Sequence, residues 1–540
     1  MSRTAAVAAL AAGCVLTALA GHAATIEVIY SRASGGPTAT VPGAVDLSGN
    51  PATASFNSML EFWLSPDGSK WLLRGSTSQP TAESDAYLLL GSGTSGSVVL
   101  QEGRPFPGAV GSEVIEFFSS TVSYPFNAQN DWAFAFRARG GVAANQQKIV
   151  RYTSAGAGVL RFQQGDAYSG LTDNPDGNAG NETIGNSPGN LSLRNNGAIL
   201  WHDPNPSNLS STRYPIAALD GVRYLQSNAD TVTRLDGSGP VGLSRIASFG
   251  TLTVLQTSAD GTRVVVRGAA DLDGNNAYNA ASDPDIVVVD GAIRVQAGQP
   301  LPGDSSLTVL AINQIFIAGN NDWYARGTTS SGAWAVKNGT VIAKTGDAVG
   351  SDTWGAPTFF TITGNSSGDW LVAGKTTNPD PAVDDVVVVN GNVVAREGDP
   401  VSVDTDGDGS PETVFIGRSN NTLAAFGANS SAGLAPDGTA YIIANLRTAA
   451  GADLAPAGVP YALLRISPGG GCAGNACGSS DYNGDGDFGT DQDIEAFFAC
   501  IGGNCCDTCF CQGSDFNGDG DFGTDQDIEA FFRVLGGNPC

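Results

Sequence analysis

Oxygen-bearing side chains recur at calcium-loop spacing in two nearly identical stretches near the end of the chain. Residues 481–498 read DYNGDGDFGTDQDIEAFF, and residues 515–532 repeat them with one difference. Each copy places Asp, Asn and Asp at positions 1, 3 and 5 and Gly at position 6, where an EF-hand loop needs oxygen ligands and a sharp turn. The pattern predicts two Ca2+ sites, with Asp481, Asn483, Asp485, Asp487 and Asp493 as ligands of the first and Asp515, Asn517, Asp519, Asp521 and Asp527 as ligands of the second.

The closing ligand is the point at which both copies depart from an EF-hand loop. Position 12, which should carry a carboxylate, is Gln492 in the first copy, and the second copy has Gln at the same place. We interpret this as a one-residue insertion that moves the closing carboxylate to Asp493. Asp491 is the alternative closing ligand, and the same choice exists in the second copy.

Each loop is followed by the pattern of an amphipathic helix. Thr490 is a hydroxyl cap with a carboxylate three residues later, the arrangement of a capping box. Apolar residues then recur at i, i+3, i+4 and i+7. A disordered acidic tail does not need such a stripe, repeated in register. The stripe comprises Ile494, Phe497, Phe498 and Ile501, and the second copy repeats it with Ile528, Phe531, Phe532 and Leu535.

Two loop–helix halves that begin with DxNxDG and are joined by a short link resemble a dockerin, closest to its cysteine-flanked variant. The resemblance covers about Cys472 to Cys540. It implies a duplicated, EF-hand-like calcium module that attaches a secreted protein to a cohesin-like or other anchoring protein. The Ser/Thr pair through which ordinary dockerins recognise their partner has no clear counterpart here, so the resemblance leaves the partner open.

The cysteines indicate that the same region is stapled by disulfides. Eight of the nine lie in the last 69 residues, and the ninth is Cys14. An even number in a small exported module is typical of disulfide bonds, and eight cysteines leave their connectivity open. A zinc site at Cys506 and Cys509 is the alternative.

The start of the chain is expected to direct export. Residues 1–23 contain one basic residue, an apolar run and a small-residue exit, which is the pattern of a signal peptide. The rest of the sequence has no apolar run long enough to insert into a membrane directly. A formal net charge of −26 repels nucleic acid and favours divalent cations. We expect a secreted or cell-surface protein that binds no nucleic acid.

The body, residues 24–466, is predicted to be mainly β. A turn followed by a short strand that opens on a large side chain recurs, and Val-rich hairpins ending at glycine follow it, some with Asn-Gly or Asp-Gly turns of type I′. This rhythm predicts a β-propeller of about seven blades, with a β-sandwich array or β-solenoid as the alternative. The opening side chains, expected to pack between blades, are Trp71, Trp132, Trp201, Val264, Trp323, Trp370 and Tyr441.

The predicted order is therefore a signal peptide (1–23), a β-propeller-like body (24–466), a Gly/Cys-rich linker (467–480) and a small, disulfide-rich, dockerin-like calcium module (472–540). Two acidic segments inside the body, 404–412 and 271–276, are either calcium-pinned hairpin loops or ordinary turns.

Two functions from different classes remain open. The mature chain has one histidine, His202, which we expect in a loop or on a blade surface. A Ser-His-Asp triad would have to use this residue, and metal sites that need two or three histidines cannot form. A non-enzymatic, dockerin-anchored propeller that binds or scaffolds glycan or protein is the favoured function. The alternative is a carbohydrate-active enzyme, a glycoside hydrolase or polysaccharide lyase of polysaccharide catabolism. Two carboxylates about 5–10 Å apart at the mouth of an open channel would favour hydrolysis.

Overall fold

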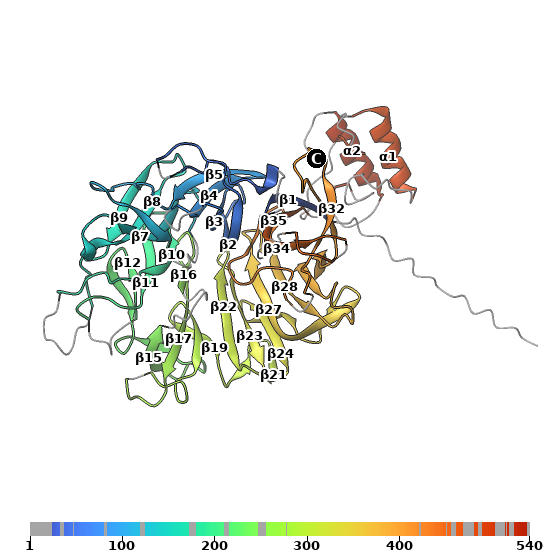
Figure 1. Cartoon of the computed structure of the whole chain (residues 1–540). Coiled ribbons are helices and arrows are strands. Elements are labelled where there is room, and N and C mark those ends of the chain that lie inside the picture. Colours follow the sequence, from blue (N-terminus) through green and yellow to red (C-terminus); the bar gives the residue numbers. More distant parts are fainter. Residues whose placement is uncertain are drawn as a thin grey trace, which may run out of the picture. The chain divides into compact units, whose positions relative to one another are not determined.

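The structure is a computed structural model of the whole chain (Figure 1). It forms two compact units, one of Thr25–Pro468 and one that includes Gly469–Cys540, and each is described by itself. The structure describes residues 24–32, 37–46, 48–79, 84–118, 125–171, 180–209, 215–246, 255–276, 278–420, 423–449, 451–454, 461–467, 480–483, 489–502, 514, 516–517 and 523–536. The predicted signal peptide, nearly all of the linker and every cysteine except Cys500 lie outside these residues.

Six sheets of the body each contain four consecutive antiparallel strands. Their strands are β2 (Phe56–Leu64), β3 (Trp71–Thr77), β4 (Ala86–Ser92) and β5 (Ser95–Gln101); β6 (Val114–Phe118), β7 (Trp132–Arg139), β8 (Gln147–Tyr152) and β9 (Gly158–Gln163); β10 (Gly189–Leu193), β11 (Ile199–Asp203), β12 (Ile216–Leu219) and β13 (Val222–Gln226); β16 (Leu255–Thr257), β17 (Val264–Asp271), β18 (Asp285–Val289) and β19 (Ala292–Gln296); β22 (Ala311–Ile317), β23 (Trp323–Thr329), β24 (Gly332–Lys337) and β25 (Thr340–Lys344); and β27 (Asp352–Gly364), β28 (Trp370–Thr376), β29 (Asp385–Val389) and β30 (Asn392–Arg396).

A further sheet joins the two ends of the body. Its four neighbouring strands are β33 (Ala432–Leu434), β34 (Ala440–Arg447), β35 (Tyr461–Ser467) and β1 (Thr25–Ser31). The first strand pairs antiparallel with the last, from Thr25 opposite Ser467 to Ser31 opposite Ala462. Because strands more than 400 residues apart share one sheet, the body closes on itself.

Shorter strands extend three of these sheets. The strands β14 (Thr231–Thr233) and β15 (Pro240–Ile246) join the sheet of β16–β19, β26 (Ala348–Val349) joins that of β27–β30, and β31 (Pro400–Val403) with β32 (Glu412–Ile416) joins β34. A separate pair consists of β20 (Pro300–Leu301) and β21 (Asp304–Thr308), and the body also has the short 3-10 helices η1 (Pro37–Ala39) and η2 (Ala143–Asn145).

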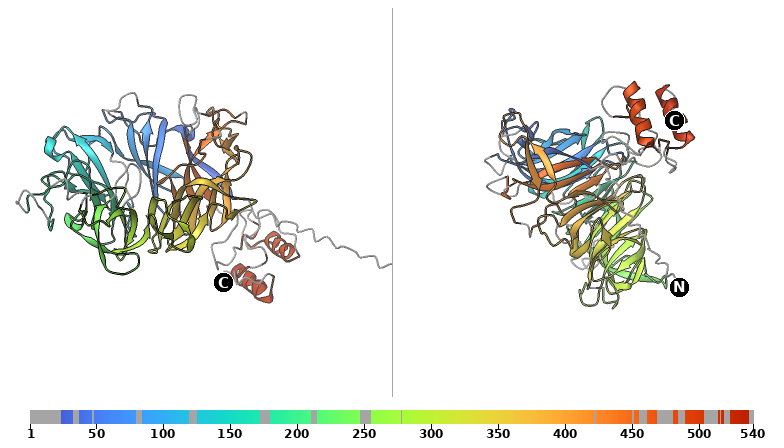
Figure 2. Two further views of the ribbon diagram at one scale, coloured as in Figure 1. Left: turned by 90° about the horizontal axis from the view of Figure 1, so that it is seen from below. Right: turned by 90° about the vertical axis from the view of Figure 1, so that its right-hand side faces the viewer.

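The sheets lie radially around a common centre, which is a propeller arrangement (Figure 1, Figure 2). The predictions of a mainly β body and of a propeller are confirmed, and a sandwich array or a solenoid is not what the body forms. A propeller stacks each sheet face to face on its neighbours, so apolar side chains are needed on both faces of the strands.

The large side chains that open the repeats start, or nearly start, the second strand of each sheet and are mostly buried. Trp71 and Trp201 are fully buried, and Trp132 and Trp323 are 2% and 5% exposed. Trp71 packs in a cluster shared by the sheet of β2–β5 and the closing sheet, with residues such as Tyr30 and Leu463. The expectation that these residues pack between blades is confirmed.

The expected type I′ turns are present in the hairpins. Both central residues have positive φ, with 50° at Asn338 and 83° at Gly339, so that the turn follows the twist of the flanking strands. Asp290 with Gly291 and Asn390 with Gly391 have the same signs of φ.

The C-terminal unit contains two helices, α1 (Asp491–Ile501) and α2 (Asp525–Leu535). The predicted capping residues Thr490 and Thr524 are the N-caps, and both capping boxes form. The residues at the centre of the apolar stripes are buried in a shared aromatic core, whereas Phe498 and Phe532 on the same stripes are exposed. The core consists of Tyr482, Phe497, Cys500, Phe516, Ala530 and Phe531, and Cys500 is disulfide-bonded. No helix among the described residues is long and apolar enough to cross a membrane.

Candidate functional sites

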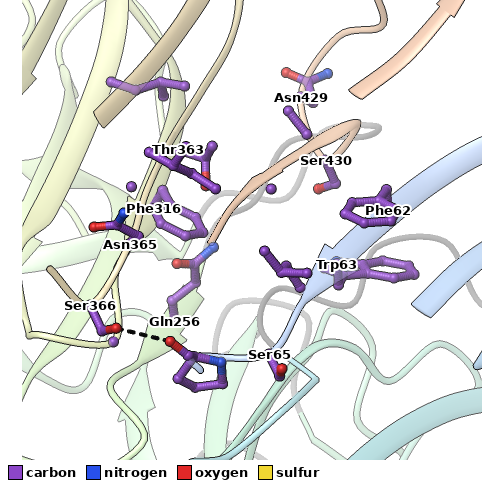
Figure 3. Close-up of a pocket in the computed structure, with 18 of the residues that line it drawn as sticks. Phe62, Trp63, Ser65, Gln256, Phe316, Thr363, Asn365, Ser366, Asn429 and Ser430 are labelled. Atoms are coloured by element: carbon purple, nitrogen blue, oxygen red, sulfur yellow. Dashed lines mark hydrogen bonds between the residues drawn. The ribbon is translucent and has the colours of Figure 1, made fainter. Parts of the chain in front are cut away.

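A small cavity lies where the innermost strands of several sheets meet (Figure 3). Phe62 and Trp63 come from β2, Gln314 and Phe316 from β22, and the remaining wall from β16, β27 and the segment before β33. Its volume is about 40 Å3, which holds a few water molecules, whereas ligand pockets usually measure several hundred Å3. The cavity as it stands is too small for a sugar ring.

The polar groups of this cavity are used to join the sheets. Gln314 accepts hydrogen bonds from Arg326 Nε at 2.8 Å and from the backbone N–H of Ile362 at 3.2 Å, and Gln256 accepts one from Ile317 at 2.7 Å. Burial lowers the pKa of Arg326 to about 10. The described residues that line the cavity include no carboxylate, so the pair that hydrolysis would need is not in this wall.

A larger groove lies between the sheets of β16–β19 and β22–β25. Its volume is about 580 Å3, and its wall includes Arg263, Asp290, Arg294, Trp323 and Asn338. The Arg263 guanidinium lies 3.2 Å from Asp290 Oδ2 and also donates to the backbone carbonyl of Asn321, while Arg294 is exposed. The wall of the groove therefore contains the exposed Arg294 and an Arg263 that is paired with Asp290, on a protein of strongly negative charge.

The structure describes half of the predicted calcium ligands. Asp481, Asn483, Asp493, Asn517 and Asp527 are among the described residues, and Asp485, Asp487, Asp515, Asp519 and Asp521 lie outside them.

Asp493 ties the start of its loop to the start of its helix. Its carboxylate is fully buried, and Oδ1 accepts from the backbone N–H groups of Tyr482 at 2.8 Å and Asn483 at 3.2 Å. Oδ2 accepts from the Thr490 N–H at 2.8 Å and the Thr490 hydroxyl at 2.9 Å. Burial raises the pKa of this carboxyl, but the hydrogen bonds outweigh burial and hold the pKa below its ordinary value. Asp491, the alternative closing ligand, is exposed.

Asp527 plays the same part in the second copy. It accepts from the backbone N–H of Asn517 at 3.2 Å and from the Thr524 N–H and hydroxyl, each at 2.8 Å. The structure thus brings position 3 of each loop against the first turn of its helix.

Among the described residues of the body, three groups of acidic residues converge, each with one oxygen per residue within 4.8 Å of the others. Two of these groups include residues of the acidic segments 404–412 and 271–276 that the sequence suggests. Asp404 lies close to other acids of its own segment, and Asp271 lies close to Asp273. In the first segment, Asp404 accepts from the backbone N–H groups of Gly407 at 2.6 Å and Gly409 at 3.0 Å, as in a tight turn. The groups are Asp404 with Asp406 and Glu412; Asp271 with Asp273 and Asp283; and Asp384 with Asp385 and Glu397.

Sequence reasoning missed the third group. Asp384 and Asp385 stand at the start of β29, and Glu397 follows β30, so the hairpin brings them together without any loop spacing. The sequence does contain an indication of this group, because acidic residues stand at the start of the first strand and after the end of the second strand of one predicted hairpin.

The expectation that His202 lies in a loop or on a blade surface is wrong. His202 belongs to β11 and is 1% exposed, because all five residues of this strand are buried between neighbouring sheets.

No protein-family model matches this chain, and no curated protein matches it. Solved structures with a similar fold include the Dos1 propeller, with 10% identity, a TM-score of 0.31 and coverage of 79% of this chain and 95% of that one. The polysaccharide lyase Uly1 has 10% identity and a TM-score of 0.35, over 78% of this chain and 91% of that one. Prolyl oligopeptidase B from Galerina marginata has 11% identity and a TM-score of 0.30, over 68% of this chain and 47% of that chain, so this chain spans about half of its length. The likeness concerns the fold alone.

Proposed function

We propose that this protein is an exported, calcium-binding propeller that binds or scaffolds glycan or protein at the cell surface or outside the cell. We propose further that its C-terminal unit is a dockerin-like module that attaches to a cohesin-like or other anchoring protein. The observation that carries the proposal is the duplicated loop and helix, in which Asp493 and Asp527 tie each loop start to a helix cap around a shared aromatic core.

Calcium is the cofactor that this arrangement favours. Asp481, Asn483, Asp485 and Asp487 would supply oxygens from the first loop, with Asp487 using its carbonyl. The closing ligand is Asp493 or Asp491. A Ca2+ ion that binds Asp493 has to replace at least one of its four hydrogen bonds, whereas the exposed Asp491 can turn toward the loop without that loss.

The exposed phenylalanines of the two helices suit an anchoring surface. Phe498 and Phe532 are 44% and 47% exposed, occupy equivalent positions in the two copies, and have ring centroids 6.2 Å apart. Paired exposed aromatic rings are unusual on a free surface and frequent at protein interfaces. We propose that a cohesin-like partner covers them.

Binding fits the body better than catalysis does. The central cavity is narrow and its described wall lacks carboxylates, whereas the groove of Arg263, Arg294 and Trp323 has the volume to receive a glycan or a protein segment. Asp290 in the same wall offsets the charge of Arg263, so the exposed Arg294 would attract an anionic ligand. We count the closing sheet of β33–β35 and β1 as a seventh blade, which makes the ring complete.

Calorimetry tests the calcium proposal on the full chain. Asp481→Ala and Asp515→Ala should each remove one Ca2+ binding event, because each takes away the position 1 ligand of one loop. Asp491→Asn and Asp493→Asn then assign the closing ligand. If neither position 1 variant changes the heat at millimolar Ca2+ and the circular dichroism spectrum is the same with and without Ca2+, the loops do not bind calcium.

The anchoring and binding roles are tested separately. Phe498→Ser with Phe532→Ser should weaken binding to an immobilised cohesin and leave Ca2+ binding intact. Arg263→Ala with Arg294→Ala should weaken retention on an anionic polysaccharide in native gels. Release of sugar fragments by the wild-type protein would contradict the non-enzymatic function and support the carbohydrate-active alternative.

A further inference from the structure

Three buried acids meet at the open end of the β29–β30 hairpin. Asp385 and Glu397 have no exposed surface, and Asp384 is 6% exposed. The antiparallel pairing places Glu397 opposite Asp385, with the Glu397 N–H donating to the Asp385 carbonyl at 2.8 Å. One oxygen from each of the three residues lies within 4.8 Å of the other two. This separation leaves room for one ion between them.

Several oxygens of this group accept no hydrogen bond. Lys375 Nζ donates to both oxygens of Asp384, at 2.6 and 2.5 Å, and the Ala425 N–H donates to Asp385 Oδ2 at 2.7 Å. Asp385 Oδ1 and both oxygens of Glu397 have no hydrogen-bond partner, although they are buried. A buried carboxylate without donors is costly, so something absent from the protein chain itself should satisfy these three oxygens.

The charged groups around the acids do not balance them. Lys375 Nζ lies 3.6 Å from Asp385 Oδ1. Arg447 donates through Nη2 to the Ala382 carbonyl, and a Cβ at Gly417 would stand 2.8 Å from Glu397 Oε1 and 3.0 Å from Arg447 Nε. Two cations therefore face three carboxylates in a site closed to water.

The charges leave one carboxylate unbalanced, because Lys375 and Arg447 face Asp384, Asp385 and Glu397. The excess charge needs either a proton or a cation.

The other blades show that this arrangement is specific to one sheet. In all six sheets of consecutive strands, the residue after the fourth strand donates its N–H to a residue within one position of the start of the third strand. Only in the sheet of β27–β30 are both residues acidic. The equivalent pairs are Ala86 with Glu102, Gln147 with Gln164, Pro215 with Ser227, Asp285 with Ala297, Ala333 with Thr345, and Asp385 with Glu397.

The sheet of β2–β5 also has an acidic residue at this place. Glu102 accepts from the Ala86 N–H, and its side chain is hydrogen-bonded to Asp85, which helps to raise the pKa of Glu102 to about 7. The two carboxyl groups of that pair are hydrogen-bonded directly to each other. Glu397 makes no such bond, although it lies at the equivalent position. The oxygens that Glu397, Asp385 and Asp384 offer, one from each, lie within 4.8 Å of one another and suit an ion instead.

We propose that Asp384, Asp385 and Glu397 form a binding site for Ca2+ inside the sheet of β27–β30. Carboxylate oxygens without His or Cys select a hard cation. The closed site favours Ca2+ over Mg2+, because Mg2+ gives up its water reluctantly. The site is separate from the C-terminal unit and does not depend on its function.

The ion content of the full chain tests this site. After equilibration with Ca2+ and removal of free ion, Glu397→Gln and Asp385→Asn should each contain about one Ca2+ fewer than the wild type, because each removes a charged ligand. Glu102→Gln is the matched control and should keep the wild-type content. Equal ion content in Glu397→Gln and the wild type would overturn the proposal.

A second measurement uses the wild type alone and so does not depend on how the variants fold. Amide hydrogen exchange across residues 385–397 should be at least about 10-fold slower with Ca2+ than with a chelator, because the ion links both ends of the hairpin. The β4–β5 hairpin should exchange at the same rate in both conditions. Unchanged exchange at residues 385–397 would also overturn the proposal.

Discussion

Glu102 and Glu397 occupy equivalent positions, but Ala86 stands opposite Glu102, whereas Asp385 stands opposite Glu397. Glu102 is 5% exposed and hydrogen-bonded to Asp85, which favours a shared proton. A protonated acid can donate a hydrogen bond, so a pair of acids can be satisfied without any ion. The third acid in the sheet of β27–β30 changes that balance.

The raised pKa of Glu102 predicts how stability depends on pH. The pKa of Glu102 is about 7 in the folded protein, above its unfolded value, so its contribution is fully present below about pH 4.5 and is lost as pH rises through 7. Glu102→Gln should remove this dependence and make the protein more stable than the wild type at pH 8, by on the order of 2 kcal/mol. Chemical denaturation at pH 5 and pH 8 measures it. Parallel pH profiles for the two proteins would show that Glu102 is ionised in the fold.

At the scale of single elements, α1 depends on one carboxylate. Asp493 holds Thr490 and the first residues of the loop through four hydrogen bonds. Asp493→Asn should therefore lower helix content and destabilise the C-terminal unit by about 1–2 kcal/mol even in chelator. Circular dichroism measures this, with the exposed Gln492→Ala as control. If Asp493→Asn has less helix than the wild type in Ca2+ but the same helix content in chelator, the carboxylate acts as a ligand and not as a cap.

The pKa of Asp493 gives this prediction a pH window. Since hydrogen bonds hold the pKa below its ordinary value, the contribution of Asp493 is present above about pH 4 and is lost as pH falls further. The loss of helix on acidification should be smaller in Asp493→Asn than in the wild type.

The β18–β19 hairpin depends on a turn that most side chains resist. Gly291 has φ of 78°, and a Cβ there would meet nothing within 4 Å, so a substitution acts through the backbone alone. Gly291→Ala should cost about 1 kcal/mol in the free energy of unfolding. Gly291→Asn, which adopts positive φ more readily, should cost less. Equal losses in the two variants would mean that the cost is not one of backbone conformation.

Local patterns predicted the parts of the fold that have local causes. Trp71 after a turn, Asn338 before Gly339 and Thr490 before a stripe of apolar residues each led to the correct strand, hairpin or helix. The innermost strands were not predicted, because β16 has three residues and β27 is irregular, with shifts in register after Trp354.

Tertiary features had only a weak signal in the sequence. The acids of the β29–β30 hairpin are 12 to 13 residues apart, and only the pairing of Glu397 with Asp385 brings them together. Likewise, whether Asp493 binds an ion or caps a helix depends on whether the backbone N–H of Asn483 reaches its carboxylate. The spacing of the residues alone does not determine this contact. His202 was misplaced because the burial of β11 comes from neighbouring sheets.

At the scale of the whole body, the ring is closed by one short strand. β1 pairs with β35, and its residues Val28, Ile29 and Tyr30 are buried. Tyr30 also reaches the next sheet, where its hydroxyl accepts from the Gly96 N–H at 2.8 Å and its ring lies 5.0 Å from that of Phe56. β1 therefore holds the last sheet of the chain against the first.

Weakening this closure should destabilise the whole body in one step, because every sheet relies on two neighbours. Tyr30→Ala removes a buried aromatic ring and should cost about 3–5 kcal/mol, whereas Tyr30→Phe keeps the ring and should cost about 1 kcal/mol for the hydroxyl. Tryptophan fluorescence during denaturation reports on the event, since Trp71 packs against Tyr30 with ring centroids 6.1 Å apart. Glu27→Ala, on the exposed side of the same strand, is the control and should change stability little. A body that lacks residues 25–31 should recover stability when a peptide of that sequence is added. If that truncated body unfolds at the same denaturant concentration as the wild type, β1 does not close the ring.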